Sequence, residues 1–73
     1  MPLTLANPGT PVSIQAIRGR DRTRMFLESL GFVVGSNFTV VSELGNNIII
    51  KVKDTRIALD KDMAGRILVS SIQ

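Results

Sequence analysis

Apolar and polar residues alternate along much of this chain, and alternation with a period of two is the pattern of a β-strand with one buried face. It occurs in residues 12–17, 38–43, 48–53 and 56–59. A fifth segment, 66–69, is short and mostly apolar, and we expect it to form the closing strand. The pattern therefore predicts a mainly β protein of five short strands.

The alternation also predicts which strand side chains point inward. The expected inward set is Val12, Ile14, Ala16, Ile48, Ile50, Val52, Ile57 and Leu59. On the third strand the expected outward set is Ile49, Lys51 and Lys53. Residues 45–47 have the composition of a hairpin turn and residues 54–55 that of a tighter turn, so the later strands should form a meander.

Between the first two strands the apolar spacing changes to three and four residues, which is the pattern of an amphipathic helix. We expect this helix to begin at Asp21, acting as its N-cap, and to end near Leu30. Arg24 and Glu28, four residues apart, would pair on its solvent side. The stripe that packs on the sheet would consist of Phe26, Leu27 and Leu30, with Met25 at its edge.

Two glycines shape the exit from this helix. Gly31 suits the left-handed position just past the helix end, and Gly35 provides a second permissive site before the next strand. Closer to the C-terminus, residues 60–65 predict a single helical turn capped by Asp60.

The chain is long enough for one domain, residues 1–73, near the lower size limit for a core without disulfides or metals. An open five-stranded sheet of this size would expose long edges, and closure into a barrel removes most of them. We therefore predict a small SH3-like barrel with one helix after the first strand and a helical turn before the last. Such barrels are more often binding modules than enzymes.

The composition argues against catalysis and against metal binding. The sequence contains no cysteine and no histidine, which removes the commonest soft metal ligands and the usual bases for nucleophilic catalysis. Asp54, Asp60 and Asp62 lie close together in sequence, but turn and capping roles explain them better than a carboxylate cluster. None of the six glycines belongs to a P-loop pattern. We expect no catalytic site, no metal site and no cofactor.

No apolar run exceeds three residues, so nothing approaches the roughly 18 residues of a membrane span. The first residues lack the basic region and apolar stretch of a signal peptide. We therefore expect a cytoplasmic protein without membrane insertion.

The formal net charge of +3 is compatible with acidic partners of several kinds. Arginines at positions 18, 20, 22 and 24 would scatter around a loop and helix, which favours a solvated basic rim over a phosphate track. The sequence has no tryptophan or tyrosine on which bases could stack, so we do not expect a nucleic acid as a partner. A basic small barrel that binds nucleic acid remains the alternative.

The loops predicted around the barrel are more apolar than loops require. At least one of Phe32, Val33 and Leu44 should be partly exposed, and exposed apolar side chains rimmed by charge mark a partner surface. Phe32 is the preferred anchor. A basic edge of Lys51, Lys53 and Arg56 across the turn at residues 54–55 could meet an acidic partner, although keeping the strands from pairing with other sheets is its simpler role. The candidate partner-binding residues are Gly31, Phe32, Val33, Leu44, Asn46, Lys51 and Lys53.

Several segments follow one another in a specific order and spacing: residues 3–9 (LTLANPG), 27–32 (LESLGF), the Gly35 turn, 38–41 (FTVV), 50–59 and 64–69. This order and spacing resemble the FeoA family of small cytoplasmic proteins that accompany the bacterial ferrous iron transporter FeoB. Two departures lie in turns: Val34 stands where the family commonly has proline, and residues 45–47 stand where it commonly has Gly-Asp-Pro.

The resemblance implies an SH3-like domain with a non-catalytic role in iron homeostasis, as an accessory or regulatory partner of FeoB on its cytoplasmic side. FeoB is a membrane protein with a cytoplasmic GTPase region that carries ferrous iron inward. Assembly into a homo-oligomer is left open. The barrel is also similar to the C-terminal domain of iron-dependent repressors of the diphtheria-toxin-repressor type. No DNA-binding helices precede it in this sequence, so we expect the accessory protein rather than a repressor fragment.

Overall fold

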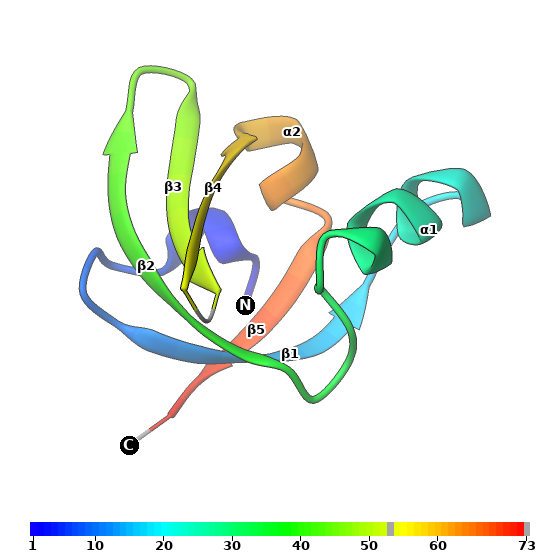
Figure 1. Ribbon diagram of the computed structural model, residues 1–73, viewed down its shortest axis with the longest axis horizontal. Helices are drawn as coiled ribbons and strands as arrows, with labels where there is room; N and C mark the ends of the chain where they lie inside the picture. Colours follow the sequence, from blue (N-terminus) through cyan, green and yellow to red (C-terminus); the bar gives the residue numbers. More distant parts are fainter. Residues whose placement is uncertain (53, 73) are drawn as a thin grey trace.

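Five antiparallel strands form one sheet in the order β4-β3-β2-β1-β5 in the computed structural model, which describes residues 1–52 and 54–72 (Figure 1). The strands are β1 (Pro11–Ile17), β2 (Asn37–Leu44), β3 (Asn47–Val52), β4 (Thr55–Asp60) and β5 (Ile67–Ser71). The helical elements are η1 (Leu3–Leu5), α1 (Asp21–Ser29) and α2 (Lys61–Ala64). The element order predicted from the apolar pattern is confirmed, with η1 as an addition.

The sheet curves strongly but does not close into the expected barrel. Within the described part of the chain β4 and β5 are not neighbours, and each forms one edge of the sheet. The outer edge of β5 is occupied by the start of the chain. Met1 and Val69 exchange two main-chain hydrogen bonds of 2.7 and 2.9 Å, and Pro2 forms a bridge with Leu68. The first residues therefore take the place beside β5 that β4 would fill in a closed barrel.

The burial pattern of the strands follows the predicted alternation at most positions and departs from it at the end of β1, while Val52 and Ile57 are half-buried but pack against the core. Ile48 and Ile50 on β3 are buried, as are Val12 and Ile14 on β1. Ala16, the next inward position by alternation, is only half-buried, and Ile17 is the buried residue instead. The pairing of β1 with β5 shifts register between Ile14 and Ala16, and such a bulge adds one residue and reverses the alternation beyond it.

Helix α1 buries less of its surface than its apolar stripe predicted. Leu27 is fully buried, whereas Phe26 is 50% and Met25 is 69% exposed. The physical reason is visible in Figure 1, where α1 projects sideways from the sheet instead of lying flat across it. Only one side chain per turn can then reach the core.

The polar contacts predicted for α1 are also corrected. The N-cap is Arg20, which makes no side-chain capping bond, and Asp21 is already the first helical residue. Its carboxylate nevertheless lies in the first turn, where negative charge is favourable to the helix dipole. Among the described residues, no ion pair links Arg24 to Glu28.

The C-terminus of α1 has the geometry that Gly31 predicted. Gly31 has a φ of +98°, and its N–H donates to the Glu28 carbonyl over 3.0 Å. The N–H of Phe32 donates to the Leu27 carbonyl over 3.0 Å. These two bonds define a Schellman motif, in which the residue after the glycine packs on the last turn of the helix. Phe32 and Leu27 are accordingly both fully buried.

The second helical turn, α2, is capped as expected. The Asp60 Oδ1 atom accepts a hydrogen bond of 2.8 Å from the main-chain N–H of Met63. This bond satisfies one of the free donors at the start of α2 and fixes the turn from β4 into the helix.

The N-terminal segment contributes to the core in a way that the strand pattern did not predict. Leu3 in η1 is fully buried and Ala6 is 5% exposed, while Leu5 between them is 66% exposed. The spacing of three between Leu3 and Ala6 is that of a 3₁₀ turn, and their burial could have been predicted from this spacing.

Candidate functional site

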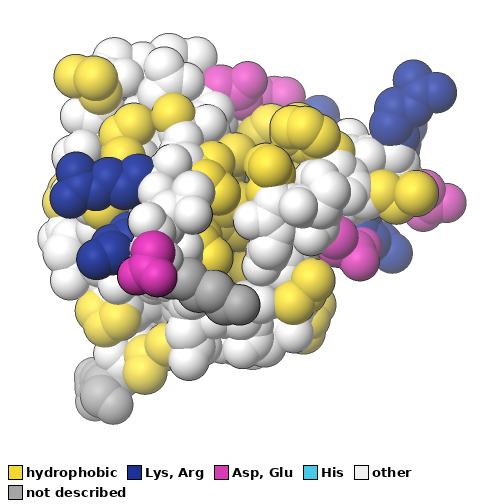
Figure 2. All heavy atoms as spheres, viewed as in Figure 1, with side chains coloured by type: hydrophobic (Ala, Val, Ile, Leu, Met, Phe, Trp, Pro, Cys, Tyr) yellow, Lys and Arg dark blue, Asp and Glu magenta, His cyan; other side chains and the backbone are white. Residues whose placement is uncertain are grey.

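The segment between α1 and β2, residues 30–36, forms a corner beside an apolar groove. The groove has a volume of about 730 Å³ and lies between this corner and the ends of β3 and β4. Its apolar lining comes from Leu30, Val33, Val52 and Ile57. Figure 2 shows apolar side chains within a hollow on this face of the molecule. The groove follows from the open sheet, because no strand formed by residues 1–52 or 54–72 fills the space beyond β4.

A second, smaller groove of about 430 Å³ lies on the other side of the corner, between β1 and α1. Val33 lines both grooves, and Val34 lines the second. These two valines are 43% and 67% exposed. We call Leu30, Val33, Val34 and Ile57 together the corner surface. It offers apolar contact on a backbone that two left-handed glycines, Gly31 and Gly35, hold in place.

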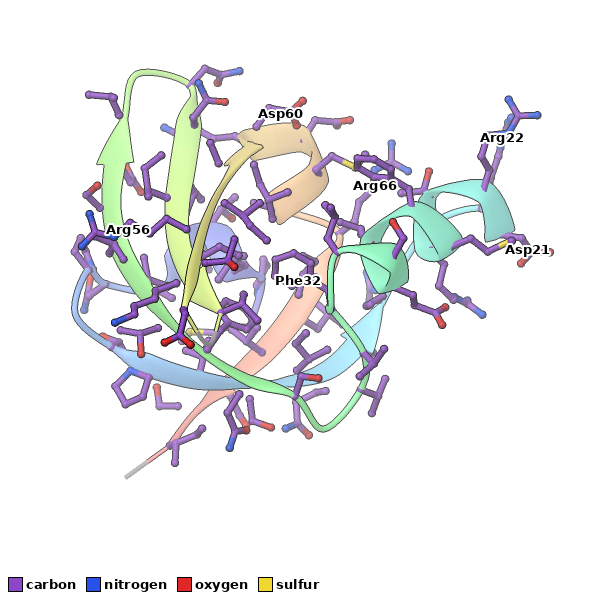
Figure 3. All side chains as sticks on the ribbon, in the orientation of Figure 1. Asp21, Arg22, Phe32, Arg56, Asp60 and Arg66 are labelled. Atoms are coloured by element: carbon purple, nitrogen blue, oxygen red, sulfur yellow. The ribbon has the colours of Figure 1, made fainter. Side chains whose placement is uncertain are left out.

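Phe32, the preferred anchor from the sequence, is not part of any exposed surface. Its side chain is fully buried and points into the interior (Figure 3). The Schellman motif is the physical reason, since it directs this position onto the last turn of α1. The expectation that at least one of Phe32, Val33 and Leu44 is partly exposed is met by Val33 and Leu44.

The structure separates the candidate residues of the corner from those of the hairpin. Leu44 is 71% exposed and Asn46 is also exposed, but Leu44 is the last residue of β2 and Asn46 lies in the turn after it, whereas the corner precedes the first residue of β2. An eight-residue strand spans about 23 Å, so the two loops do not form one surface. The sequence placed them together because both are apolar loops, but a strand carries its two ends to opposite sides of the sheet.

The predicted basic edge is only partly described. Lys51 is exposed and lies between Thr39 on β2 and Arg56 on β4 in the sheet register. Lys53 lies outside the described residues. The corner surface also includes Val34, one of the apolar residues of the predicted loops, and Leu30 and Ile57, which the sequence pattern assigned to the core. The partial exposure of Ile57 depends on the open edge of the sheet, which the sequence pattern does not record.

The arginines at positions 18, 20, 22 and 24 are all exposed, on the loop after β1 and on α1. Arg22 points away from the body of the protein in Figure 3. Arg66 lies closer to the sheet and approaches Asp62 to 3.4 Å, four residues away. The arginines therefore do not converge on a single point.

The described residues provide little for chemistry on a bound substrate. Over residues 1–52 and 54–72, no group of three or more His, Cys, Asp or Glu side chains is placed to hold a metal ion. The buried side chains in the same part of the chain are all apolar. No helix in that part is long and apolar enough to cross a membrane. The described residues instead provide an exposed apolar surface suited to contact with another molecule.

Comparison with known proteins adds the family. A model described as the FeoA domain matches residues 1–71. No match was found among curated proteins. Among solved structures, the crystal structure of an iron uptake regulatory protein (FeoA) is 34% identical, with a TM-score of 0.88 over 97% of this chain and 95% of that one. Iron(II) transport protein A from Clostridium thermocellum is 28% identical, with a TM-score of 0.91 over 99% of this chain and 46% of that one.

A metal-dependent repressor also shares the fold. The structure of a manganese-dependent transcriptional repressor in complex with manganese is 18% identical, with a TM-score of 0.89 over 99% of this chain and 36% of that one. A likeness at this level of identity shows the fold alone, and it agrees with the predicted SH3-like class. The match over residues 1–71 and the 34% identical FeoA structure are more specific. On this evidence the chain belongs to the FeoA domain family, which is involved in ferrous iron transport and is not a known enzyme family.

Proposed function

We propose that this protein is a non-catalytic accessory protein of ferrous iron uptake, which acts in the cytoplasm by binding the cytoplasmic part of a FeoB-type transporter. The observation that carries the proposal is the match to the FeoA domain over nearly the whole chain. Membership fits an iron uptake system, and the 34% identical neighbour is itself described as an iron uptake regulatory protein.

The corner surface supports binding as the mode of action. Val33 and Val34 are exposed valines beside two grooves, and an exposed apolar patch on a domain this small is typical of a partner surface. The backbone beneath them is fixed by the Schellman motif and by two hydrogen bonds of 2.9 Å, from Gly35 N–H to the Ile14 carbonyl and from Ile14 N–H to the Ser36 carbonyl. A rigid surface loses little entropy on binding, which favours affinity.

The test compares two exposed apolar residues in binding to the purified cytoplasmic part of FeoB. Val34→Ser changes the corner surface, and Leu44→Ser is the matched control because Leu44 is similarly exposed at the far end of β2. We expect Val34→Ser to weaken binding about tenfold or more, as the loss of a central apolar contact does. Leu44→Ser should leave it within about twofold.

Three results would change the proposal. Loss of binding with Leu44→Ser but not with Val34→Ser would place the partner surface at the hairpin. Loss with Lys51→Glu alone would place it at the basic edge. If the wild-type protein does not bind FeoB at all, the accessory role itself is wrong.

A nucleic-acid-binding role has less support. The repressor neighbours share only the fold, and the exposed arginines do not converge. Binding to an oligonucleotide that persists at physiological salt, with an affinity that falls steeply as salt rises, would favour this alternative.

A further inference from the structure

The two edges of the sheet differ in whether they are covered. The start of the chain pairs with β5 through Met1 and Pro2. Along the outer edge of β4, no strand or bridge is found among the described residues. Unpaired edges of this kind are templates for pairing with another strand.

The main-chain groups that face this open edge can be identified. Lys61 N–H donates to the Asn46 carbonyl over 3.0 Å, one step beyond the register pair Asn47 and Asp60. Bonded and non-bonded pairs alternate in an antiparallel ladder, so Asp60, Ala58 and Arg56 occupy non-bonded positions toward β3. Their N–H and C=O groups therefore point away from β3, toward the open edge.

The side chains at these positions carry an unusual charge pattern. Arg56 lies directly opposite Lys51 in the register of β3 and β4, and both side chains are exposed. Like charges at opposed positions destabilise a sheet. Asp60 lies at the other end of β4 (Figure 3), and Ala58, small and exposed, lies midway between them.

We propose that β4 pairs with β4 of a second copy of this chain, antiparallel and centred on Ala58. In this register Ala58 faces Ala58 of the second copy, and Arg56 faces Asp60 of the second copy, twice by symmetry. The sequence of β4 is thus complementary to itself, as a two-fold interface requires. Each Arg56 gains an acidic neighbour on one side that offsets Lys51 on the other.

The same pairing covers apolar surface. Ile57 is half-buried and lines the larger groove, and it comes opposite Leu59 of the second copy on the inner face. The interface consists of one six-residue strand from each copy. We expect so small an interface to bury less accessible surface than the roughly 1,200 Å² of a stable complex. We therefore expect a weak dimer that forms with rising protein concentration.

Charge complementation between variants tests the register. Arg56→Glu places Glu opposite Asp60 in its own dimer, and Asp60→Lys places Lys opposite Arg56, so sedimentation should show each variant alone as monomeric. An equal mixture should dimerise again, because both charge pairs are then opposite in sign. Arg22→Glu, the same charge change on α1, is the matched control and should dimerise as the wild type does.

Loss of dimerisation in these variants can be distinguished from loss of folding. Arg56→Glu replaces a repulsive contact with Lys51 by an attractive one, so its monomer should be stable. If Asp60→Lys fails to fold for loss of the α2 cap, Asp60→Asn keeps a capping side chain and should weaken dimerisation at least about threefold by removing the charge. In NMR spectra the amides of Arg56, Ala58 and Asp60 should shift with concentration. A wild-type protein that stays monomeric at millimolar concentration, a dimer that survives Arg56→Glu, or shifts confined to residues 30–35 between α1 and β2 would overturn the proposal.

Discussion

The rings of Phe32 and Phe38 meet edge to face, with their centroids 5.4 Å apart and an interplanar angle of 86°. Phe32 follows the end of α1 and Phe38 lies near the start of β2, so this pair ties the helix to the sheet across the corner. Both rings are buried, at 0% and 5% exposure. The corner surface is therefore supported from beneath by an aromatic contact.

Replacing Phe32 by alanine should lower the free energy of unfolding by about 3–5 kcal/mol, because it removes a fully buried ring and its contact with Phe38. Urea titration followed by circular dichroism measures the change. Phe26→Ala is the control, since that ring is 50% exposed, and it should cost less than about 1 kcal/mol. Equal losses in the free energy of unfolding would mean that Phe26 stabilises the protein as much as Phe32 does.

Replacing Gly31 by alanine should cost about 1–2 kcal/mol, because a Cβ atom disfavours the φ of +98°. The nearest atom to such a Cβ would be Val52 Cγ1 at 3.8 Å, an ordinary contact, so the cost is backbone strain and not a clash. Gly31→Asn should cost less than Gly31→Ala, since asparagine tolerates the left-handed region better. Thermal unfolding would rank the two, and the reverse order would argue against the strain explanation.

Replacing Asp60 by alanine should cost about 0.5–2 kcal/mol through loss of the hydrogen bond from Met63 N–H, and Asp60→Asn should recover most of it. The measurement is the melting temperature, which for a domain this small falls by about 4–8 °C per kcal/mol. Asp21→Ala is the comparison, because α1 has no side-chain capping bond, and its effect should be the smaller one. A larger effect at Asp21 would contradict the capping assignment.

The repulsion between Lys51 and Arg56 can be measured by a double-mutant cycle. Arg56→Glu or Lys51→Glu alone should raise the free energy of unfolding by about 0.2–1 kcal/mol, since each creates an opposite-charge pair. The double variant restores like charges and should lose this gain. Unfolding at low protein concentration keeps self-association out of the result, and the gains should shrink at high salt. Additive effects in the double variant would show that the two side chains do not interact.

Much of the fold could be predicted because the apolar pattern records which face of each element is buried. The turn at Gly31 and the cap at Asp60 depend on interactions between residues close in sequence, and the local alternation of apolar residues indicated where the strands lie. Membership of the FeoA family was also predictable, since the order of short segments is a property of the sequence. The predicted burial of Ala16 on β1 was wrong because the bulge that changes the alternation there depends on the partner strand, β5.

What only the tertiary structure decided is which side chains remain at the surface and which edge stays open. Phe32 and Val33 are adjacent and both apolar, but a Schellman motif buries the first and leaves the second between two grooves. Leu44 and Val33 are both exposed apolar residues, but Leu44 ends β2 and Val33 precedes it, so the strand separates them. The first residues of the chain cover β5 and leave β4 uncovered, which no local pattern indicates. Local sequence determines the conformation of each element, whereas exposure depends on contacts between residues distant in the chain.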